Sequence, residues 1–279
     1  MSDPLVKIHY HEEVATIILD RAEKRNALNR ALLNELSQAL HDLGLEKKVR
    51  AVILSGAGPS FCAGMDLKEM AATAQLPDPH AQWNSDARIY LDVIEAMLRF
   101  PKPLIAAVDG AAVAGGGGLV LAFDLVVASH GARFGFPEPR RGIVAGIVAP
   151  LLHFRTGAAD TAFMLLTGSM VDAQYAHRAG FVHALVDAEQ IWARAHELAK
   201  ECTLGAPEAV ALTKKLLNET IGDTLFSLLA AGAALSGTAR TTEAAEEGLQ
   251  AFLEKRDPVW DATGDAGTFE SNTKEYPNR

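Results

Sequence analysis

Two glycine-rich segments carry backbone groups that could stabilise negative charge on a bound oxygen. Residues 61–67 read Phe-Cys-Ala-Gly-Met-Asp-Leu, and residues 115–118 are four consecutive glycines. Each segment follows an apolar stretch typical of a buried strand, at 51–54 and 104–108, and each precedes residues that favour a helix. A helix that begins at glycine leaves backbone N–H groups without partners at the positive end of its dipole. We therefore expect two such ends to hold one carbonyl oxygen between them.

Glycine clusters also have a simpler interpretation as turns or tight packing, because glycine tolerates backbone angles and close approaches that a Cβ forbids. One cluster alone favours that interpretation, whereas two clusters, each after a buried strand, favour a binding site. A dinucleotide-binding fingerprint is excluded, because Val120 stands where the third glycine of G-x-G-x-x-G is needed. The sequence also lacks the P-loop, the G-x-S-x-G nucleophile elbow and the H-E-x-x-H zinc motif.

The composition is that of an ordinary globular enzyme. The 279 residues are 49% hydrophobic and 22% charged, with a formal net charge of −9, and the length permits one large domain or one domain with an appendage. The negative charge argues against a nucleic-acid partner, although a small anionic ligand could still bind a few local cations. The two cysteines, Cys62 and Cys202, are far apart, so we expect no disulfide framework and no metal site.

The first residues and the apolar segments of the chain do not predict a membrane location. The first residues lack the basic and apolar regions of a signal peptide, so we expect a cytoplasmic protein. Residues 104–129 are long and apolar enough to cross a bilayer, but Asp109, Asp124 and the four glycines would weaken a membrane helix. We expect a buried strand, a turn, a buried helix and a second strand instead.

Hydrophobic spacing predicts a β-hairpin at 6–10 and 14–19, followed by helices with polar caps. Asn29 is expected to cap a helix that runs to about residue 43, and Asp66 to cap the helix after the first glycine turn. Residues 73–85 are polar and contain two prolines, so we expect a mobile loop over the site. Further helices are expected at 86–99, 191–202, 207–217, 224–236 and 242–255, further strands at 124–128, 133–135 and 183–186, and a polar tail at 261–279.

Six motifs in one order resemble the crotonase superfamily, also called the enoyl-CoA hydratase/isomerase family. They lie at 20–29 (Asp-Arg-Ala-Glu-Lys-Arg-Asn-Ala-Leu-Asn), 61–67, 101–110, 115–118, 134–138 (Phe-Gly-Phe-Pro-Glu) and 247–256, within a resemblance that covers residues 1–258. The resemblance implies an α/β fold, a crotonase-like spiral of ββα units with a helical C-terminal region. It implies a spiral core with the acyl-CoA site at 1–202, a helical trimerisation region at 203–258, and a loose tail at 259–279.

The same resemblance implies an acyl-CoA substrate, with coenzyme A as part of the thioester and no separate cofactor, metal or membrane partner, in a homotrimer or homohexamer. It assigns the oxyanion donors to the N–H groups of Met65 and Gly116. The implied contacts to coenzyme A or the acyl group are Lys24, Ala27, Ala63, Gly64, Asp66, Leu67, Leu119, Phe252 and Lys255. Lys24 could contact a phosphate or simply be solvated. Phe252 and Lys255 could equally be a core aromatic and an exposed lysine.

Hydratases of this family use two glutamates, because adding water needs a base for water and an acid for Cα. The first position is Leu119 here, and the second is Glu138. Glu138 lies among prolines and phenylalanines, so we expect burial to raise its pKa, although a turn glutamate could merely bind nearby backbone. One glutamate beside an oxyanion hole is sufficient to move a double bond, so isomerisation is favoured.

Several alternatives stay open at this point. Asp124, Glu69 or a loop residue could replace the missing glutamate and restore hydration. The chain could instead hydrolyse a thioester, catalyse another reaction through an enolate, or bind acyl-CoA without catalysis. The apolar segment 142–152 fits either an acyl tail or helix packing.

Overall fold

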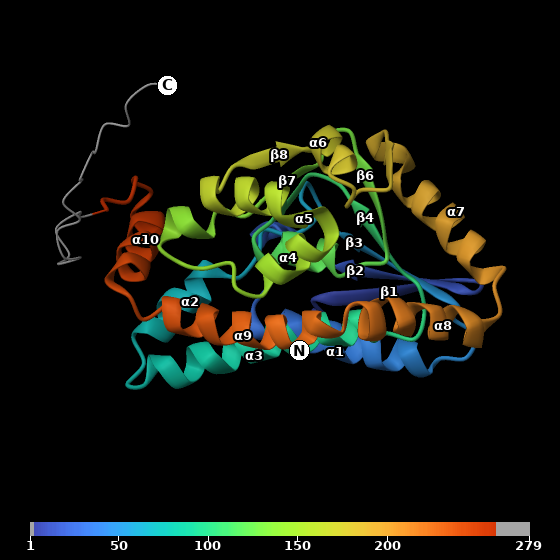
Figure 1. Cartoon of the computed structure of the whole chain (residues 1–279), viewed down its shortest axis with the longest axis horizontal. Coiled ribbons are helices and arrows are strands. Elements are labelled where there is room, and N and C mark those ends of the chain that lie inside the picture. Colours follow the sequence, from blue (N-terminus) through green and yellow to red (C-terminus); the bar gives the residue numbers. More distant parts are fainter. Residues whose placement is uncertain (1–2, 261–279) are drawn as a thin grey trace, which may run out of the picture.

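A six-stranded sheet lies at the centre of the fold in the computed structural model, which describes residues 3–260. Its strands are in the order β1-β2-β3-β4-β6-β9, and only β1 and β2 pair antiparallel (Figure 1). The strands are β1 (Val6–His11), β2 (Val14–Leu19), β3 (Ala51–Gly56), β4 (Leu104–Val108), β6 (Leu125–Ser129) and β9 (Ala184–Val186). A smaller sheet contains β5 (Ala111–Val113), β7 (Arg133–Gly135) and β8 (Met170–Asp172).

Successive turns of the chain add one strand to each sheet. β4 enters the large sheet and β5 the small one, and the next turn repeats this with β6 and β7, which pair parallel to β4 and β5. Parallel strands need a crossover connection, which here is supplied by α1 (Arg30–Leu45), by α2 (Leu67–Ala74) with α3 (Pro79–Leu98), and by α4 (Gly115–Leu121). The result is a spiral of strand and helix units.

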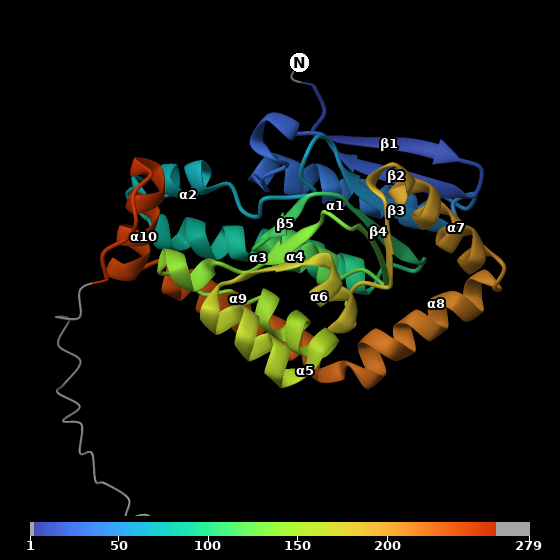
Figure 2. The same cartoon turned by 90° about the horizontal axis from the view of Figure 1, so that it is seen from above.

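Helices cover both faces of the large sheet, because its buried parallel strands are apolar on both sides. On β3, Val52 and Leu54 belong to the main core with α1 and α3, whereas Ala51 and Ile53 pack in a second cluster. That second cluster is closed by α7 (Ile191–Thr203), which contacts β2, β3, β4 and β6. Figure 2 shows α7 and α1 on either side of the strands.

The C-terminal helices pack against the elements that form the site. They are α8 (Pro207–Lys215), the π-helical turn η4 (Leu216–Ile221), α9 (Asp223–Ala239) and α10 (Glu243–Glu254), and they follow α5 (Val148–Thr167) and α6 (Ala173–Arg178). α9 contacts α3 and α5, and α10 contacts α2 and the short helix η2 (Glu138–Arg141). Of the tail expected at 259–279, residues 261–279 lie outside the described residues.

Most local expectations are confirmed. β1 and β2 form the hairpin, Asn29 accepts a hydrogen bond from the Leu32 N–H at 2.9 Å, and Asp66 caps α2. The loop expected at 73–85 is wrong, since α2 extends to Ala74 and α3 begins at Pro79. Asp78 caps α3, and a proline in the first helical turn lacks only an N–H that has no helical partner.

The apolar stretch 104–129 forms β4, β5, α4 and β6, so it is not one helix. Within residues 3–260, no single helix is long and apolar enough to cross a bilayer. The segments Pro207–Ile221 and Asp223–Ala239 satisfy that criterion only as a pair bent by 64°.

Candidate active site

The two glycine-rich turns lie in direct backbone contact. The Cys62 N–H donates to the Ala111 carbonyl at 3.0 Å, and the Val113 N–H donates to the Cys62 carbonyl at 2.9 Å. Gly116 packs directly on the Cys62 backbone, where a Cβ would overlap the Cys62 carbonyl oxygen. Glycine is therefore required at position 116 for the start of α4 to approach the first turn.

In the first turn, the free N–H group belongs to Met65, which precedes α2. The sequence pattern predicts the free N–H groups at the N-terminal end of the helix itself. Asp66 accepts hydrogen bonds from the Lys68 and Glu69 N–H groups at 3.0 and 3.3 Å, so its side chain satisfies the start of α2. The Met65 N–H precedes this cap and has no hydrogen-bond partner among residues 3–260. The dipole argument therefore does not apply to the first turn.

The second turn does match a helix N-terminus. Ala114 precedes α4 without any side-chain cap, and the Gly118 N–H makes the first helical bond, to the Ala114 carbonyl at 2.9 Å. In the described part of the chain, the N–H groups of Gly115, Gly116 and Gly117 are left without partners. Ala114 itself has φ 51° and ψ −125°, a conformation that costs about 1–3 kcal/mol for a residue with a Cβ.

Tyr90 and Asn26 hold the two turns in place. The Tyr90 hydroxyl donates to the Gly115 carbonyl at 2.6 Å. The fully buried Asn26 amide donates to the carbonyls of Ser60 and Phe61 at 2.9 and 3.2 Å. Sequence reasoning assigned no role to either residue, although Asn26 lies inside the matched motif at 20–29 and is a buried amide within a charged run.

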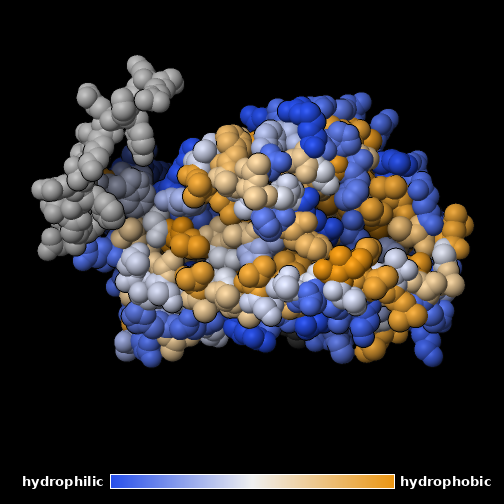
Figure 3. Space-filling model, in the orientation of Figure 1, coloured by the Kyte–Doolittle hydropathy of each residue, from blue (hydrophilic) through white to orange (hydrophobic). Residues whose placement is uncertain are grey.

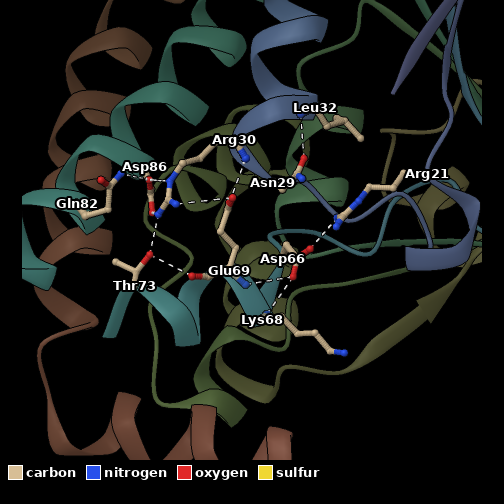
Figure 4. Close-up of polar contacts among 10 residues, drawn as sticks. All are labelled: Arg21, Asn29, Arg30, Leu32, Asp66, Lys68, Glu69, Thr73, Gln82 and Asp86. Carbon is tan, nitrogen blue, oxygen red and sulfur yellow. Dashed lines mark hydrogen bonds and ion pairs between the residues drawn. The ribbon is translucent and has the colours of Figure 1, made fainter. Parts of the chain in front are cut away.

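A network of charged side chains anchors α2 to α1 and α3 (Figure 4). The Arg30 guanidinium binds both oxygens of Asp86, at 2.6 and 2.8 Å, and Glu69 accepts the Arg30 N–H at 3.1 Å. The Asp66 carboxylate binds the Arg21 guanidinium at 2.7 Å. Burial raises the pKa of Asp66, but the Arg21 and backbone hydrogen bonds outweigh it and lower the pKa below its ordinary value. The Asp66 side chain is therefore occupied in holding the first turn.

A cavity opens beside both turns. It is lined by Ala63, Met65 and Leu67 from the first turn and by Gly115 from the second. Its other walls come from Tyr90 on α3, from Glu138 and Arg141, from the apolar segment 143–148, from Ser236 on α9, and from Arg240, which directly follows α9. Among the residues of the described chain that line this cavity, Glu138 is the only carboxylic acid.

Glu138 has the properties of a proton shuttle. It is 6% exposed, and its Oε2 is buried without a hydrogen-bond partner among residues 3–260. Burial raises the pKa of Glu138 from 4.5 to about 7, because the ionised carboxylate loses hydration. A group with this pKa can both accept and return a proton near neutral pH.

The remaining predicted site residues are dispersed. Leu119 is 0% exposed in the core and is not a lining residue of the cavity. Lys24 is exposed on η1 (Ala22–Lys24), and the Ala27 carbonyl accepts from Arg21. The Arg141 guanidinium lies over the Phe252 ring, 4.7 Å from the centroid of that ring. Lys255 is exposed and caps the C-terminus of α10.

Two cavity residues gave no sequence signal of their own. Arg141 follows Glu138 in a Pro-Arg-Arg run that is unremarkable in a turn, and Arg240 stands alone at the end of a helix. Asp124 and Glu69, which the sequence left open as substitutes for the first glutamate, do not line the cavity. Asp124 binds Lys214 at 2.7 Å, and Glu69 binds the Arg30 N–H.

Two packed glycine turns and one buried glutamate on a spiral of strand and helix units form the arrangement that the resemblance to the crotonase superfamily implies. The enoyl-CoA hydratase/isomerase family model matches residues 9–263, and the chain belongs to this family of enzymes.

Named relatives and solved structures agree with this assignment. A Thermus thermophilus protein, provisionally described as an enoyl-CoA hydratase, is 37% identical over 88% of this chain and 96% of its own length. The 1,2-epoxyphenylacetyl-CoA isomerase of Escherichia coli is 29% identical over 90% and 95%. The crystal structure of an enoyl-CoA hydratase/isomerase from Xanthobacter autotrophicus Py2 is 30% identical, with a TM-score of 0.82 over 91% of this chain and 97% of that one. The chain therefore has the crotonase fold.

Proposed function

We propose that this protein binds acyl-CoA thioesters and moves a double bond in the acyl chain by proton transfer through Glu138. The observation that carries the proposal is Glu138, the single carboxylic acid among the described residues that line the cavity, whose burial raises its pKa to about 7. It shares the cavity with Met65 and with Gly115 at the uncapped start of α4. These groups are what an enolate-forming reaction needs, a base and an oxyanion site.

In the proposed reaction, the thioester oxygen accepts hydrogen bonds from the N–H groups of Met65 and Gly116. The Glu138 carboxylate removes a proton from Cα of a 3-enoyl-CoA, and the electron pair of the broken C–H bond delocalises onto the thioester oxygen. The protonated Glu138 then delivers that proton to the far carbon of the conjugated system, which yields the 2-enoyl-CoA and restores the carboxylate. No net proton, water or oxidant is consumed.

Hydration is the second candidate, because most of the similar proteins that carry a description, including the Thermus thermophilus protein and those of Mycobacterium, Rhodobacter capsulatus and Rhizobium meliloti, are described as enoyl-CoA hydratases. A hydratase must also activate water, for which this cavity offers no second carboxylic acid among the described lining residues. Leu119 occupies the position of the first glutamate and is fully buried. Thioester hydrolysis and binding without turnover are the remaining candidates, and the experiment below separates enolate formation from binding alone.

The test is Cα proton exchange in deuterated water, measured by mass spectrometry for a panel of acyl-CoA thioesters. The wild type should exchange Cα protons, and Glu138→Gln should abolish exchange while thioester affinity stays within a few-fold. Glu189→Gln, on an exposed turn, is the matched control and should leave exchange unchanged. Undiminished exchange in Glu138→Gln contradicts the role of Glu138, and tight binding without exchange by the wild type indicates an inactive binder.

We also propose that the chain assembles as a homotrimer or homohexamer. Figure 3 shows apolar residues gathered over α8 and α9, and large side chains there are at least half exposed in one copy: Leu212, Leu216, Leu217, Ile221, Leu228 and Leu235. Covering such a surface removes apolar area from water and stabilises an assembly. Light scattering that shows only monomers would contradict this assembly. The expected cytoplasmic location is a separate proposal, which cell fractionation would test.

A further inference from the structure

A partly buried cation whose Nη1 atom has no hydrogen-bond partner in the described structure lies beside the candidate active site. Arg240, at the C-terminal end of α9, lines the cavity that contains Glu138 and also an adjoining groove between α2, the start of α3 and α10. Its Nη1 atom is buried and has no hydrogen-bond partner among residues 3–260. Because a buried guanidinium N–H without a partner is costly, an anion that reaches Nη1 would stabilise this position.

The neighbouring carboxylate does not fill that role. Asp86 attracts Arg240 electrostatically, yet no hydrogen bond joins them in the described structure. Both oxygens of Asp86 instead bind Arg30, and one also accepts from Gln82 at 2.8 Å (Figure 4). The Arg240 guanidinium is thus placed at the end of α9 near an acid whose oxygens already accept three hydrogen bonds from Arg30 and Gln82.

A second guanidinium lines the same two spaces. Arg141 packs over the Phe252 ring and faces the cavity and the groove, as Arg240 does. The only carboxylic acid in the cavity lining of the described chain is Glu138, which must exchange its proton with substrate. The surrounding walls are apolar, including Met70 and Ile143, so the two arginines make this part of the cavity a receptor for a negative charge.

We propose that the acyl chain of the substrate carries a carboxylate, remote from the thioester, that binds Arg240 with support from Arg141. The inference rests on the proposed function and narrows it to carboxyl-bearing acyl-CoA thioesters. A phosphate group of coenzyme A is the other anion that Arg240 and Arg141 would bind. The cavity that contains the proton-transferring Glu138 must hold the acyl end. Of the positions implied for coenzyme A, Lys24 and Ala27 line neither space, whereas Leu67 lines both and Phe252 lines the groove, so the experiment must separate the two anions.

The experiment compares pairs of enoyl-CoA thioesters of equal chain length, ending in a methyl or a carboxylate group. The wild type should have the higher kcat/KM for one carboxylate-ended member of the series. Arg240→Met should lower that kcat/KM at least about 30-fold, the loss expected for truncating one partner of a buried charge pair, and should spare the methyl-ended partner. Arg240→Lys should retain part of the preference, because it keeps a point charge without the planar fork.

Arg194→Met is the matched control, since Arg194 lies on α7, pairs with Glu197 and is remote from both spaces. An equal loss for both thioesters and for free coenzyme A would assign Arg240 to a phosphate and overturn the proposal. A wild type without any preference for a carboxylate also overturns it, even if Arg240→Met does not fold. If no thioester reacts, calorimetric binding of saturated methyl-ended and carboxylate-ended acyl-CoA still tests the inference apart from the proposed reaction.

Discussion

The stability of the protein should depend on pH through Glu138, in a way that Glu138→Gln removes. Burial raises the pKa of this carboxyl from 4.5 to about 7 in the folded chain. At 1.36 kcal/mol per pKa unit, the shift corresponds to about 3 kcal/mol of difference between the neutral and ionised forms. The carboxyl is buried, so solvent screens little of this free energy.

The sign follows from where each state loses its proton. In the unfolded chain Glu138 ionises near pH 4.5, whereas in the folded chain it keeps its proton until about pH 7. Its contribution to the free energy of unfolding is therefore fully present below pH 4.5, decreases as the pH rises, and is lost once the pH has passed about 7. Glutamine stays neutral throughout and shows no such loss.

The measurement is urea unfolding of the wild type and Glu138→Gln at fixed protein concentration from pH 4 to pH 8. The difference between the two free energies of unfolding cancels every other titration and should move by about 3 kcal/mol in favour of glutamine as the pH rises. The kcat/KM for Cα exchange should rise with pH around 7, since the base must be ionised. The raised pKa would be refuted if the difference in free energy of unfolding between the wild type and Glu138→Gln did not change with pH, and if the exchange rate were already maximal at pH 5.

Two further predictions concern the oxyanion site and the missing glutamate. Met65→Pro removes the N–H donor and should lower the exchange rate on the order of 10²- to 10³-fold, whereas Met65→Leu should be mild; equal effects would point to side-chain packing instead. The wild type should isomerise a 3-enoyl-CoA faster than it hydrates a 2-enoyl-CoA. Leu119→Glu should raise the rate of hydration. It should also lower the free energy of unfolding by about 2–5 kcal/mol, because the carboxyl group enters a fully buried position. Efficient hydration by the wild type, unchanged in Leu119→Ala, would show that another group activates water.

Sequence reasoning was most accurate where the determining interactions are local. Asn29 and Asp66 cap their helices because a short polar side chain reaches N–H groups only two or three residues ahead. The hairpin of β1 and β2 follows from alternation within one short segment. Local interpretation also predicted a loop at 73–85, which is wrong, because Pro79 is compatible with both a loop and the first turn of a helix. Packing of α3 on α1 and α9 favours the helix.

Only the tertiary structure decided the environment of the candidate site. The motifs placed Glu138 and the two glycine turns in order, but the pKa of Glu138 depends on how completely neighbouring elements exclude water. Tyr90 and Arg240 come from helices far apart in the sequence, and neither carries a local motif. Arg240 became a candidate anion receptor because Arg30 occupies the Asp86 carboxylate, a competition between side chains that exists only once the three helices have packed together.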